Sequence, residues 1–311
     1  MLGERLPALG GYVRNRALRI VPAYWFVLSV TMALHGPVGA SPDQILAMYG
    51  FAQIYDPGPG TGLMVQAWTL DVEVAYYLAL PAAAAALAWL MRGRGSPADR
   101  LWGVLGLLAL VFAASLALRT ASTDTDRYDR LLPCMIFAFV PGIALAALEL
   151  WGRARGAEHA GPGWLHAGRR GPAVALGLLP GALALLVSYL ATDADALARR
   201  AGLAALGTGA LVAAPLVLQW TRGRCWRSLD NPAMDWLGAR SYSIYLVHFA
   251  IGVELVPVVR QLGSAWAAFL VLMALATPLS VLAAALVYRF VERPFLNWKR
   301  HRRPVPVRSA A

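Results

Sequence analysis

The chain has 311 residues, of which 59% are hydrophobic and 14% are charged, and its mean hydropathy is +0.54. Soluble domains carry about 25% charged residues, so this composition excludes an ordinary soluble protein and indicates one that lies in a lipid bilayer. The formal net charge of +11 would suit a nucleic-acid-binding protein. The basic residues, however, lie in short stretches between apolar runs and form no continuous basic face, so we exclude nucleic acid as a partner.

Eight apolar segments are long enough, or nearly so, to cross a membrane as helices, which takes about 17–25 residues. They are 20–35, 72–91, 101–118, 131–150, 172–191, 202–220, 241–259 and 265–288. Each must be helical, because lipid offers no hydrogen-bond partner to the backbone. The sequence therefore predicts an all-α, polytopic membrane helix bundle. We expect a single domain over 1–311, with a basic arm (1–19), the spans and their loops (20–288), and a basic tail (289–311).

Lysine and arginine set the predicted orientation of these spans. With both termini in the cytoplasm, the cytoplasmic segments hold 22 of the 28 basic residues and the outer loops hold 6. The positive-inside rule selects this orientation. We expect a multi-pass protein of the inner or plasma membrane, and the heavy use of alanine and arginine points to a bacterial source. Residues 1–19 have no apolar core, so no secretory signal peptide is predicted.

The first informative stretch is the basic arm, which ends in Arg14, Arg16 and Arg19 shortly before Tyr24. Arginines at the cytoplasmic end of a span usually anchor it to anionic headgroups. The same guanidinium groups also suit the phosphate oxygens of a soluble ligand. Arg16 and Arg19 are three residues apart and would share one helix face, and the sequence leaves both roles open.

A long outer loop without basic residues follows, from Gly36 to Val65. Its middle, residues 44–54, is apolar but too short to span, so we expect an interfacial or re-entrant segment. Residues 56–62 are rich in glycine and proline and are predicted to form a turn cluster that leads to Trp68.

Residues 68–81 are the stretch around which we expect the chain to be organised, because two carboxylates there precede a long apolar run. Helical spacing places Thr69, Glu73 and Tyr77 on one face, with Tyr76 beside them. Ionisable groups at the mouth of a membrane helix are costly and mark functional sites. The alternative is an interfacial belt, in which Trp and Tyr lie at headgroup level and the acids face water.

The middle of the chain carries little further chemistry. The spans between 101 and 220 are rich in Ala, Leu and Gly, and we assign them a scaffolding role. Cys134 lies in a span and Cys225 in a cytoplasmic loop, so no disulfide is predicted. The five histidines are scattered singly, so we predict no metal site and no bound cofactor.

The second informative stretch is 241–248, where Tyr242, Tyr245 and His248 recur every three or four residues and therefore share a helix face. A lone histidine in a helix bundle is often a hydrogen-bonded structural residue. An intramembrane histidine that faces a cavity is also a candidate for proton transfer, and both interpretations stay open.

The last span leaves the membrane through residues 288–295. We expect Glu292 and Arg293 at the membrane edge and Pro294 to stop the helix. The simplest interpretation is a stop signal, followed by a basic tail that lies on anionic lipid.

Four stretches together resemble the membrane-bound acyltransferase-3 family, whose members transfer acetyl or other acyl groups to hydroxyls of sugars and related acceptors. They are 14–24, 68–77, 241–248 and 291–295. The resemblance implies a membrane O-acyltransferase with acyl-CoA, most simply acetyl-CoA, as co-substrate and a carbohydrate or glycosylated molecule as acceptor. The chain departs from the family pattern at its start, since the family's first two spans, which carry the histidine thought to act as general base, are missing from it.

Acyl transfer from a thioester to a hydroxyl needs a base for the hydroxyl proton and hydrogen-bond donors for the oxyanion. The resemblance implies acyl-CoA binding by Arg16 and Arg19, and supporting catalytic roles for Glu73, Tyr245 and His248. It further implies acceptor binding by Trp68, Tyr76 and Tyr77, and structural roles at the membrane edge for Tyr24 and Glu292.

Two other functions stay open. A transporter or flippase would also combine several helices, polar groups and many prolines, although no inverted repeat is visible. A catalytically silent relative of the family could act as a membrane scaffold. Substrate flux without acyl-CoA consumption would distinguish the transporter.

Overall fold

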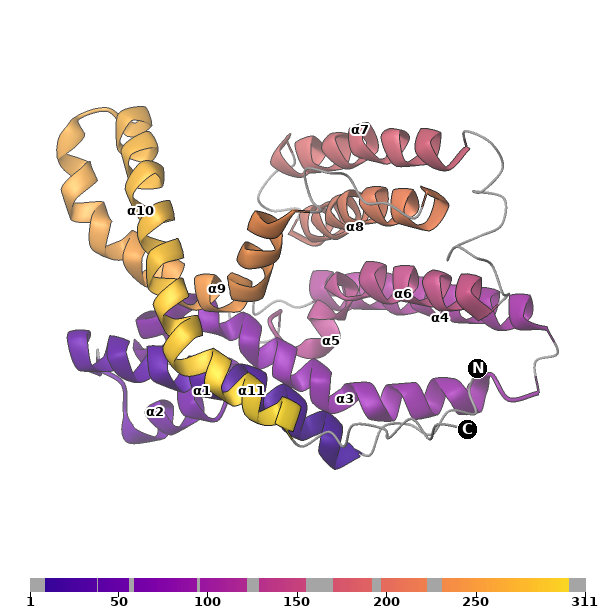
Figure 1. Cartoon of the computed structure of the whole chain (residues 1–311), viewed down its shortest axis with the longest axis horizontal. Helices are drawn as coiled ribbons and strands as arrows, with labels where there is room; N and C mark the ends of the chain where they lie inside the picture. The colour runs from indigo at the N-terminus through magenta and orange to yellow at the C-terminus, as the bar shows by residue number, and fades with distance from the viewer. Residues whose placement is uncertain are drawn as a thin grey trace, which may run out of the picture. The chain divides into compact units, whose positions relative to one another are not determined.

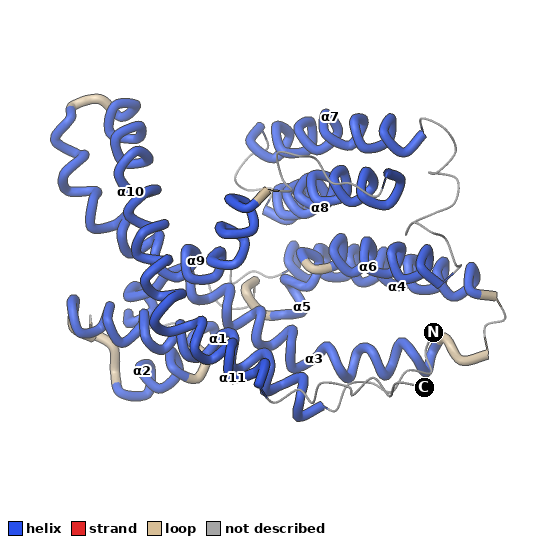
Figure 2. Tube along the Cα trace, viewed as in Figure 1, coloured by secondary structure: helices blue, strands red, loops and turns tan. Residues whose placement is uncertain are grey.

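The computed structural model describes residues 9–37, 39–55, 59–93, 96–121, 129–154, 170–191, 197–222 and 231–301. Throughout these ranges the regular elements are helices and no strand occurs (Figure 2). Seven helices in these ranges are long and apolar enough to cross a membrane, and the number is eight if a pair of shorter helices bent by 52° counts as one span. The predicted all-α, multi-span fold is confirmed, whereas the orientation of the spans stays a prediction.

The helices follow the predicted spans closely (Figure 1). They are α1 (Leu9–His35), α2 (Pro42–Tyr49), α3 (Trp68–Leu90), α4 (Pro97–Ala121), α5 (Leu132–Met135), α6 (Val140–Ala154), α7 (Arg170–Ala191), α8 (Leu197–Arg222), α9 (Pro232–Val259), α10 (Ala265–Val287) and α11 (Arg293–His301). Short 3-10 segments cover Gln53–Tyr55, Pro59–Ala67, Ile136–Ala138 and Arg260–Leu262. The predicted span 131–150 is the bent pair, in which α5 and the adjoining 3-10 turn are followed by α6.

Helix α1 begins at Leu9, well before the predicted start of the first span. The three arginines that we expected in a basic arm are therefore part of a helix. A run of apolar residues marks only the part of a helix that enters lipid. The backbone hydrogen bonds of the helix can continue beyond that part through arginine, which is a good helix former. For the same reason α9 begins at Pro232 rather than at 241.

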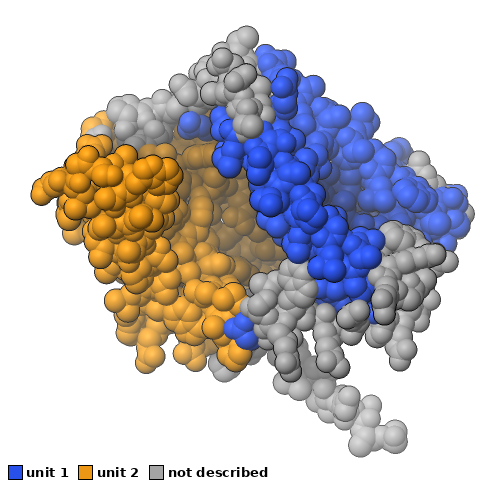
Figure 3. Space-filling model, turned by 90° about the horizontal axis from the view of Figure 1, so that it is seen from above, with its two compact units in different colours: residues 1–4, 78–231 blue, residues 5–77, 232–311 orange. Residues whose placement is uncertain are grey.

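The chain divides into two compact units, coloured separately in Figure 3. We call them the central unit (78–231, grouped with 1–4) and the terminal unit (5–77 and 232–311). The boundary lies inside α3, between Tyr77 and Leu78. The single domain predicted for 1–311 stays a prediction.

The central unit contains α4 to α8, with α7 and α8 packed side by side. A small apolar core joins Ala175 of α7 to Val217, Leu218 and Trp220 of α8. At the end of α4, Arg119 forms a buried ion pair with Asp129, with 3.3 Å between Nη2 and Oδ2. These contacts give the central unit its own interior, in keeping with the scaffolding role expected for these spans.

The core of the terminal unit is built where α1, α2 and α9 meet. Tyr24 is fully buried, and its hydroxyl donates to the carbonyl of Met48 at 2.9 Å. Helix α2 starts with a capping box, in which Ser41 and Gln44 each bond to the backbone of the other. The chain after α1 therefore turns back, and α2 lies against the middle of α1 rather than away from it.

The prediction that Pro294 stops the last helix was wrong, because helical structure continues past this residue to His301. A single π-helical turn, Tyr288–Glu292, joins α10 directly to α11. In this turn the N–H of Arg293 bonds to the carbonyl of Tyr288, one residue farther back than in an α-helix. Proline has no N–H to donate, but the first turn of a helix needs none, so Pro294 fits the start of α11.

Candidate active site

Helix α3 carries the face predicted from its sequence, and this face meets the first half of α1. The Tyr77 hydroxyl donates to Glu73 Oε1 at 2.5 Å, one turn earlier on the helix. The guanidinium carbon of Arg16 lies 4.3 Å from the centre of the Tyr77 ring and 5.7 Å from that of Tyr12. Tyr76 is half-buried beside this group, and its ring centre is 5.8 Å from that of Tyr77.

Arg16 and Arg19 retain donors for an anion. Neither forms an ion pair with a described residue, and Arg19 is exposed. Arg19 interacts electrostatically with both Tyr77 and Glu292. An arginine stacked on an aromatic ring keeps the edge of its guanidinium fork available for phosphate oxygens. We call Arg16, Arg19, Glu73 and Tyr77 the arginine cluster.

Glu292 is buried in the interior of the terminal unit, and its position at the membrane edge stays a prediction. It is 2% exposed and accepts a hydrogen bond from the Ser243 hydroxyl at 2.8 Å. Arg19 and Arg240 both interact electrostatically with it. The π turn places the carboxylate in this position, and such turns are frequent at functional sites. Tyr24, the other residue expected at the edge, is also fully interior.

A second polar group joins the start of α3 to α9. The Tyr245 hydroxyl donates to the Gln66 carbonyl at 2.5 Å and is in hydrogen-bond contact with the Thr69 hydroxyl. Gln66 in turn donates through Nε2 to the carbonyl of Leu246 at 3.1 Å. These bonds fix the beginning of α3 against the middle of α9.

His248 lies one turn beyond Tyr245 and is exposed. Its Nδ1 is 2.8 Å from the carbonyl oxygen of Tyr245. A carbonyl oxygen can only accept, so this bond assigns the proton to Nδ1 and leaves a lone pair on Nε2. The geometry therefore presents His248 as a proton acceptor. We call Gln66, Thr69, Tyr245 and His248 the tyrosine–histidine cluster.

The two clusters lie along one line of the terminal unit. Eight residues of helix separate Thr69 from Tyr77, which is about 12 Å at 1.5 Å per residue. Tyr245 stands midway along α9 (Pro232–Val259), so α3 begins beside the middle of a span. The sequence placed Trp68 in the outer loop. In the structure Trp68 is the first residue of α3 and is half-buried in the terminal unit, where α2 folds the preceding loop back onto α1.

Some site residues were missed in the sequence. Gln66 bonds to the carbonyl of Leu246, and Ser243 bonds to the carboxylate of Glu292. Neither residue gives a periodic signal in the sequence. Asp71 does not join Glu73, since it is 1% exposed and accepts from the backbone N–H of Ile54 at 3.1 Å. Residues two apart on a helix point to nearly opposite sides, so spacing could have separated the two acids.

Within the described ranges, no three His, Cys, Asp or Glu side chains gather as a metal site would require. Cys134 is buried. Cys225, the basic residues of the 155–169 loop and those from Arg302 onward lie outside the described residues.

The fold is that of a polytopic membrane protein, and its polar side chains bring together cations, hydroxyls and a proton acceptor, as group transfer requires. The chain belongs to the acyltransferase-3 family, whose model, described as an acyltransferase domain, matches residues 1–285. The exopolysaccharide production protein ExoZ of Rhizobium meliloti (strain 1021) is 29% identical over 313 aligned residues, covering 94% of this chain and 83% of ExoZ. No solved structure matches the chain. The protein is a multi-pass membrane acyltransferase, and it does not transfer amino-acyl groups.

Proposed function

We propose that this acyltransferase moves an acyl group, most simply acetyl, from acyl-CoA to a sugar hydroxyl of a polysaccharide or its glycosylated precursor in the bacterial inner or plasma membrane. The family supports acyl transfer to a hydroxyl. The printed name of ExoZ, which refers to exopolysaccharide production, supports a carbohydrate acceptor. The acyl-CoA donor and the acetyl group are inferred from the arginine cluster and from the requirements of acyl transfer from a thioester to a hydroxyl.

One observation carries the donor site. Arg16 is stacked on Tyr77, Tyr77 is fixed by Glu73, and yet neither Arg16 nor Arg19 is in an ion pair with a described residue. The Arg16 side chain is half-buried and is oriented by Tyr77, and no described carboxylate forms an ion pair with it. A cation held in this way favours an anionic ligand. The phosphates of coenzyme A are such a ligand.

The thioester of a donor held at the arginine cluster would reach the tyrosine–histidine cluster about 12 Å along α3. There the acceptor oxygen forms a bond to the acyl carbon while the carbon–sulfur bond breaks. Nε2 of His248 takes the proton of the attacking hydroxyl, and coenzyme A leaves as a thiolate that then binds a proton. Among the described residues His248 is therefore the proposed catalytic residue.

Tyr245 and Glu73 are proposed to support the reaction by positioning other residues. Tyr245 holds the Nδ1 proton of His248 by its own carbonyl and fixes Gln66 by its hydroxyl. Glu73 fixes the Tyr77 hydroxyl beneath Arg16. We assign Trp68, Tyr76 and Tyr77 to the walls of the acceptor and donor path, since they are half-buried around the first turns of α3.

The test uses membranes that contain the full chain, radiolabelled acetyl-CoA and a polysaccharide acceptor, together with coenzyme A binding to the purified protein. Arg16→Gln and Arg19→Gln are expected to weaken coenzyme A binding by about 10–100-fold, since a charge-assisted contact contributes about 1.5–3 kcal/mol. Arg14→Gln is the matched control, because Arg14 is exposed on the same helix and belongs to neither cluster.

Unchanged coenzyme A binding in both cluster variants would refute the donor site. A transporter or flippase would move the acceptor without consuming acetyl-CoA, so parallel measurement of label transfer and of acceptor flux separates the two functions.

A further inference from the structure

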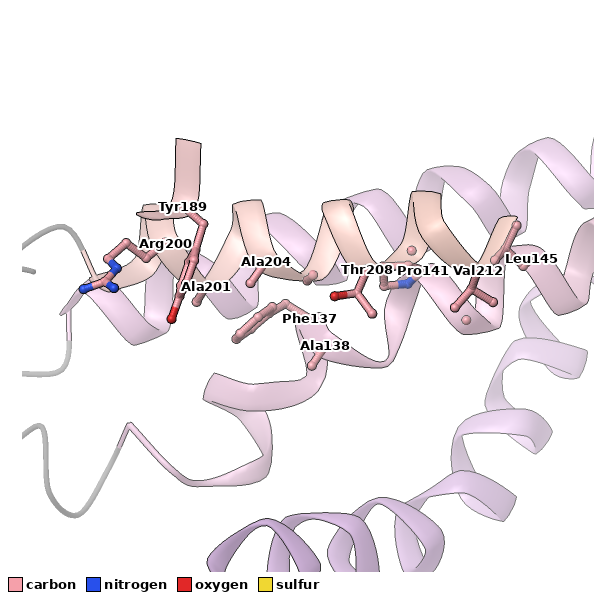
Figure 4. A pocket seen from close by; sticks show the side chains of 13 residues that line it. Phe137, Ala138, Pro141, Leu145, Tyr189, Arg200, Ala201, Ala204, Thr208 and Val212 are labelled. Carbon is pink, nitrogen blue, oxygen red and sulfur yellow. The ribbon is translucent and has the colours of Figure 1, made fainter. Parts of the chain in front are cut away.

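The central unit contains a cavity of about 650 Å³ between α6 and α8, shown close up in Figure 4. We call it the α6–α8 groove. Its walls are apolar along most of their length, with Phe137, Pro141, Leu145, Ala204, Thr208 and Val212 among the lining residues. Arg200 and Tyr189 lie together at one end of it (Figure 4). The lining residues belong to the central unit, so the groove is separate from the two clusters of the terminal unit.

Small residues on α8 make the room. Ala201, Ala204 and Ala205 line the part near Arg200, where a larger side chain would fill the space. Farther along, a Cβ on Gly209 would lie 2.7 Å from the Cβ of Pro141. Glycine is therefore needed for α8 to approach α6 at that point. Gly209 and Pro141 themselves line the groove, so this close approach forms part of its wall.

At the charged end of the groove, Arg200 has no carboxylate partner among the residues that the structure describes. Arg200 stacks on Tyr189, with 4.8 Å from its guanidinium carbon to the ring centre. It forms no ion pair with a described residue, and its Nε is buried without a hydrogen-bond partner. An apolar channel that ends in a cation, one with no ion-pair partner among the described residues, complements an amphiphile with an anionic head.

The depth of the groove matches one leaflet of a bilayer. The part of α8 that is long and apolar enough to span a membrane begins at Arg199, so we expect Arg200 to lie at the level of the phosphate headgroups. Val212, at the far end, is twelve residues on, which is about 18 Å of helix. Half of a hydrocarbon core about 30 Å thick is about 15 Å.

From these observations we propose that the α6–α8 groove binds an anionic phospholipid, with its phosphate on Arg200 and one acyl chain along Ala204, Thr208 and Val212. In the predicted orientation this lipid belongs to the outer leaflet. The site is independent of the proposed acyl transfer, because it involves neither cluster.

The test compares phosphatidylglycerol with phosphatidylcholine on the purified full chain in detergent, with bound lipid counted by native mass spectrometry. Arg200→Gln is expected to weaken phosphatidylglycerol binding by about fivefold, the effect of one arginine near a lipid headgroup. Arg199→Gln is the matched control, because its side chain is exposed and does not line the groove. Ala204→Phe is expected to abolish binding by filling the groove.

Equal losses in Arg200→Gln and Arg199→Gln would overturn the proposal, as would equal binding of the two lipids. If Ala204→Phe fails to fold, as shown by thermal unfolding, Thr208→Leu provides the second test of the apolar wall. Full phosphatidylglycerol binding by a folded groove-filling variant would also overturn the site.

Discussion

The guanidinium carbon of Arg16 lies 4.3 Å from the centre of the Tyr77 ring, and the hydroxyl of that ring donates to Glu73. This relationship joins the first half of α1 to the first half of α3. The Glu73 carboxylate forms no ion pair with Arg16 and contacts the Tyr77 hydroxyl. Glu73 thus orients Arg16 through Tyr77, and the N–H groups of Arg16 stay available to an anion.

Replacing Tyr77 separates the role of its ring from that of its hydroxyl. Tyr77→Leu removes the stacking surface of Arg16 and is expected to raise the KM for acetyl-CoA by about 2–30-fold, since cation–π contacts contribute about 0.5–2 kcal/mol. Tyr77→Phe keeps the ring and should change KM much less. Steady-state kinetics in membranes measure both, and equal effects of the two substitutions would contradict the stacking role.

His248→Gln should lower kcat by about 10²–10⁴-fold, the usual contribution of a general base, with coenzyme A affinity unchanged. Tyr245→Phe is the companion variant, because it removes the hydroxyl bond to Gln66 but keeps the backbone carbonyl that orients His248. Its kcat should fall much less than that of His248→Gln, because only the support from Gln66 is lost. A His248→Gln enzyme with full kcat would remove His248 from the chemistry.

Ser243→Ala leaves the buried Glu292 carboxylate without its hydroxyl donor. We expect a loss of about 1–3 kcal/mol in the free energy of unfolding, the cost of an unsatisfied buried group. Ser241→Ala is the control, since that hydroxyl is exposed and bonds to the Gly238 carbonyl. Thermal unfolding in detergent compares them, and similar stability of the two variants would show that Glu292 has another adequate partner.

Asp129→Asn should be among the more damaging changes in the central unit. It removes one charge of a buried pair and leaves Arg119 uncompensated, which costs about 3–5 kcal/mol. Arg153→Gln breaks an ion pair whose arginine is exposed and should cost about 0–1 kcal/mol. If melting temperatures fall equally in both, the Arg119–Asp129 contact does not stabilise the unit as described.

The spans could be predicted because a helix that crosses lipid needs a minimum length and an apolar composition, and both can be read from the sequence. The polar face of α3 was also visible, since Glu73 and Tyr77 are one turn apart and the structure joins them. Tyr242, in contrast, shares a face with Tyr245 but donates to the Ile20 carbonyl of α1. Spacing along one helix says which residues are neighbours, and not which other helix they meet.

Two features of the site depend on backbone geometry that hydropathy does not record. The position of Trp68 follows from α2 folding back onto Tyr24, a contact between residues 24 positions apart. The course of the chain through Pro294 follows from the π turn that precedes it, since proline is tolerated at the start of a helical segment. Both need knowledge of tertiary contacts, and both decide where Gln66 and Glu292 lie.

The π turn at Tyr288–Glu292 sets the rotation of α11 about the helix axis relative to α10. Each α-helical residue advances the chain by about 100°, so deleting one residue here would swing the Glu292 carboxylate far from Ser243. Relatives that adapt this span to a thicker or thinner bilayer must therefore change length elsewhere along α10, and insertions or deletions should be absent between Val287 and Arg293.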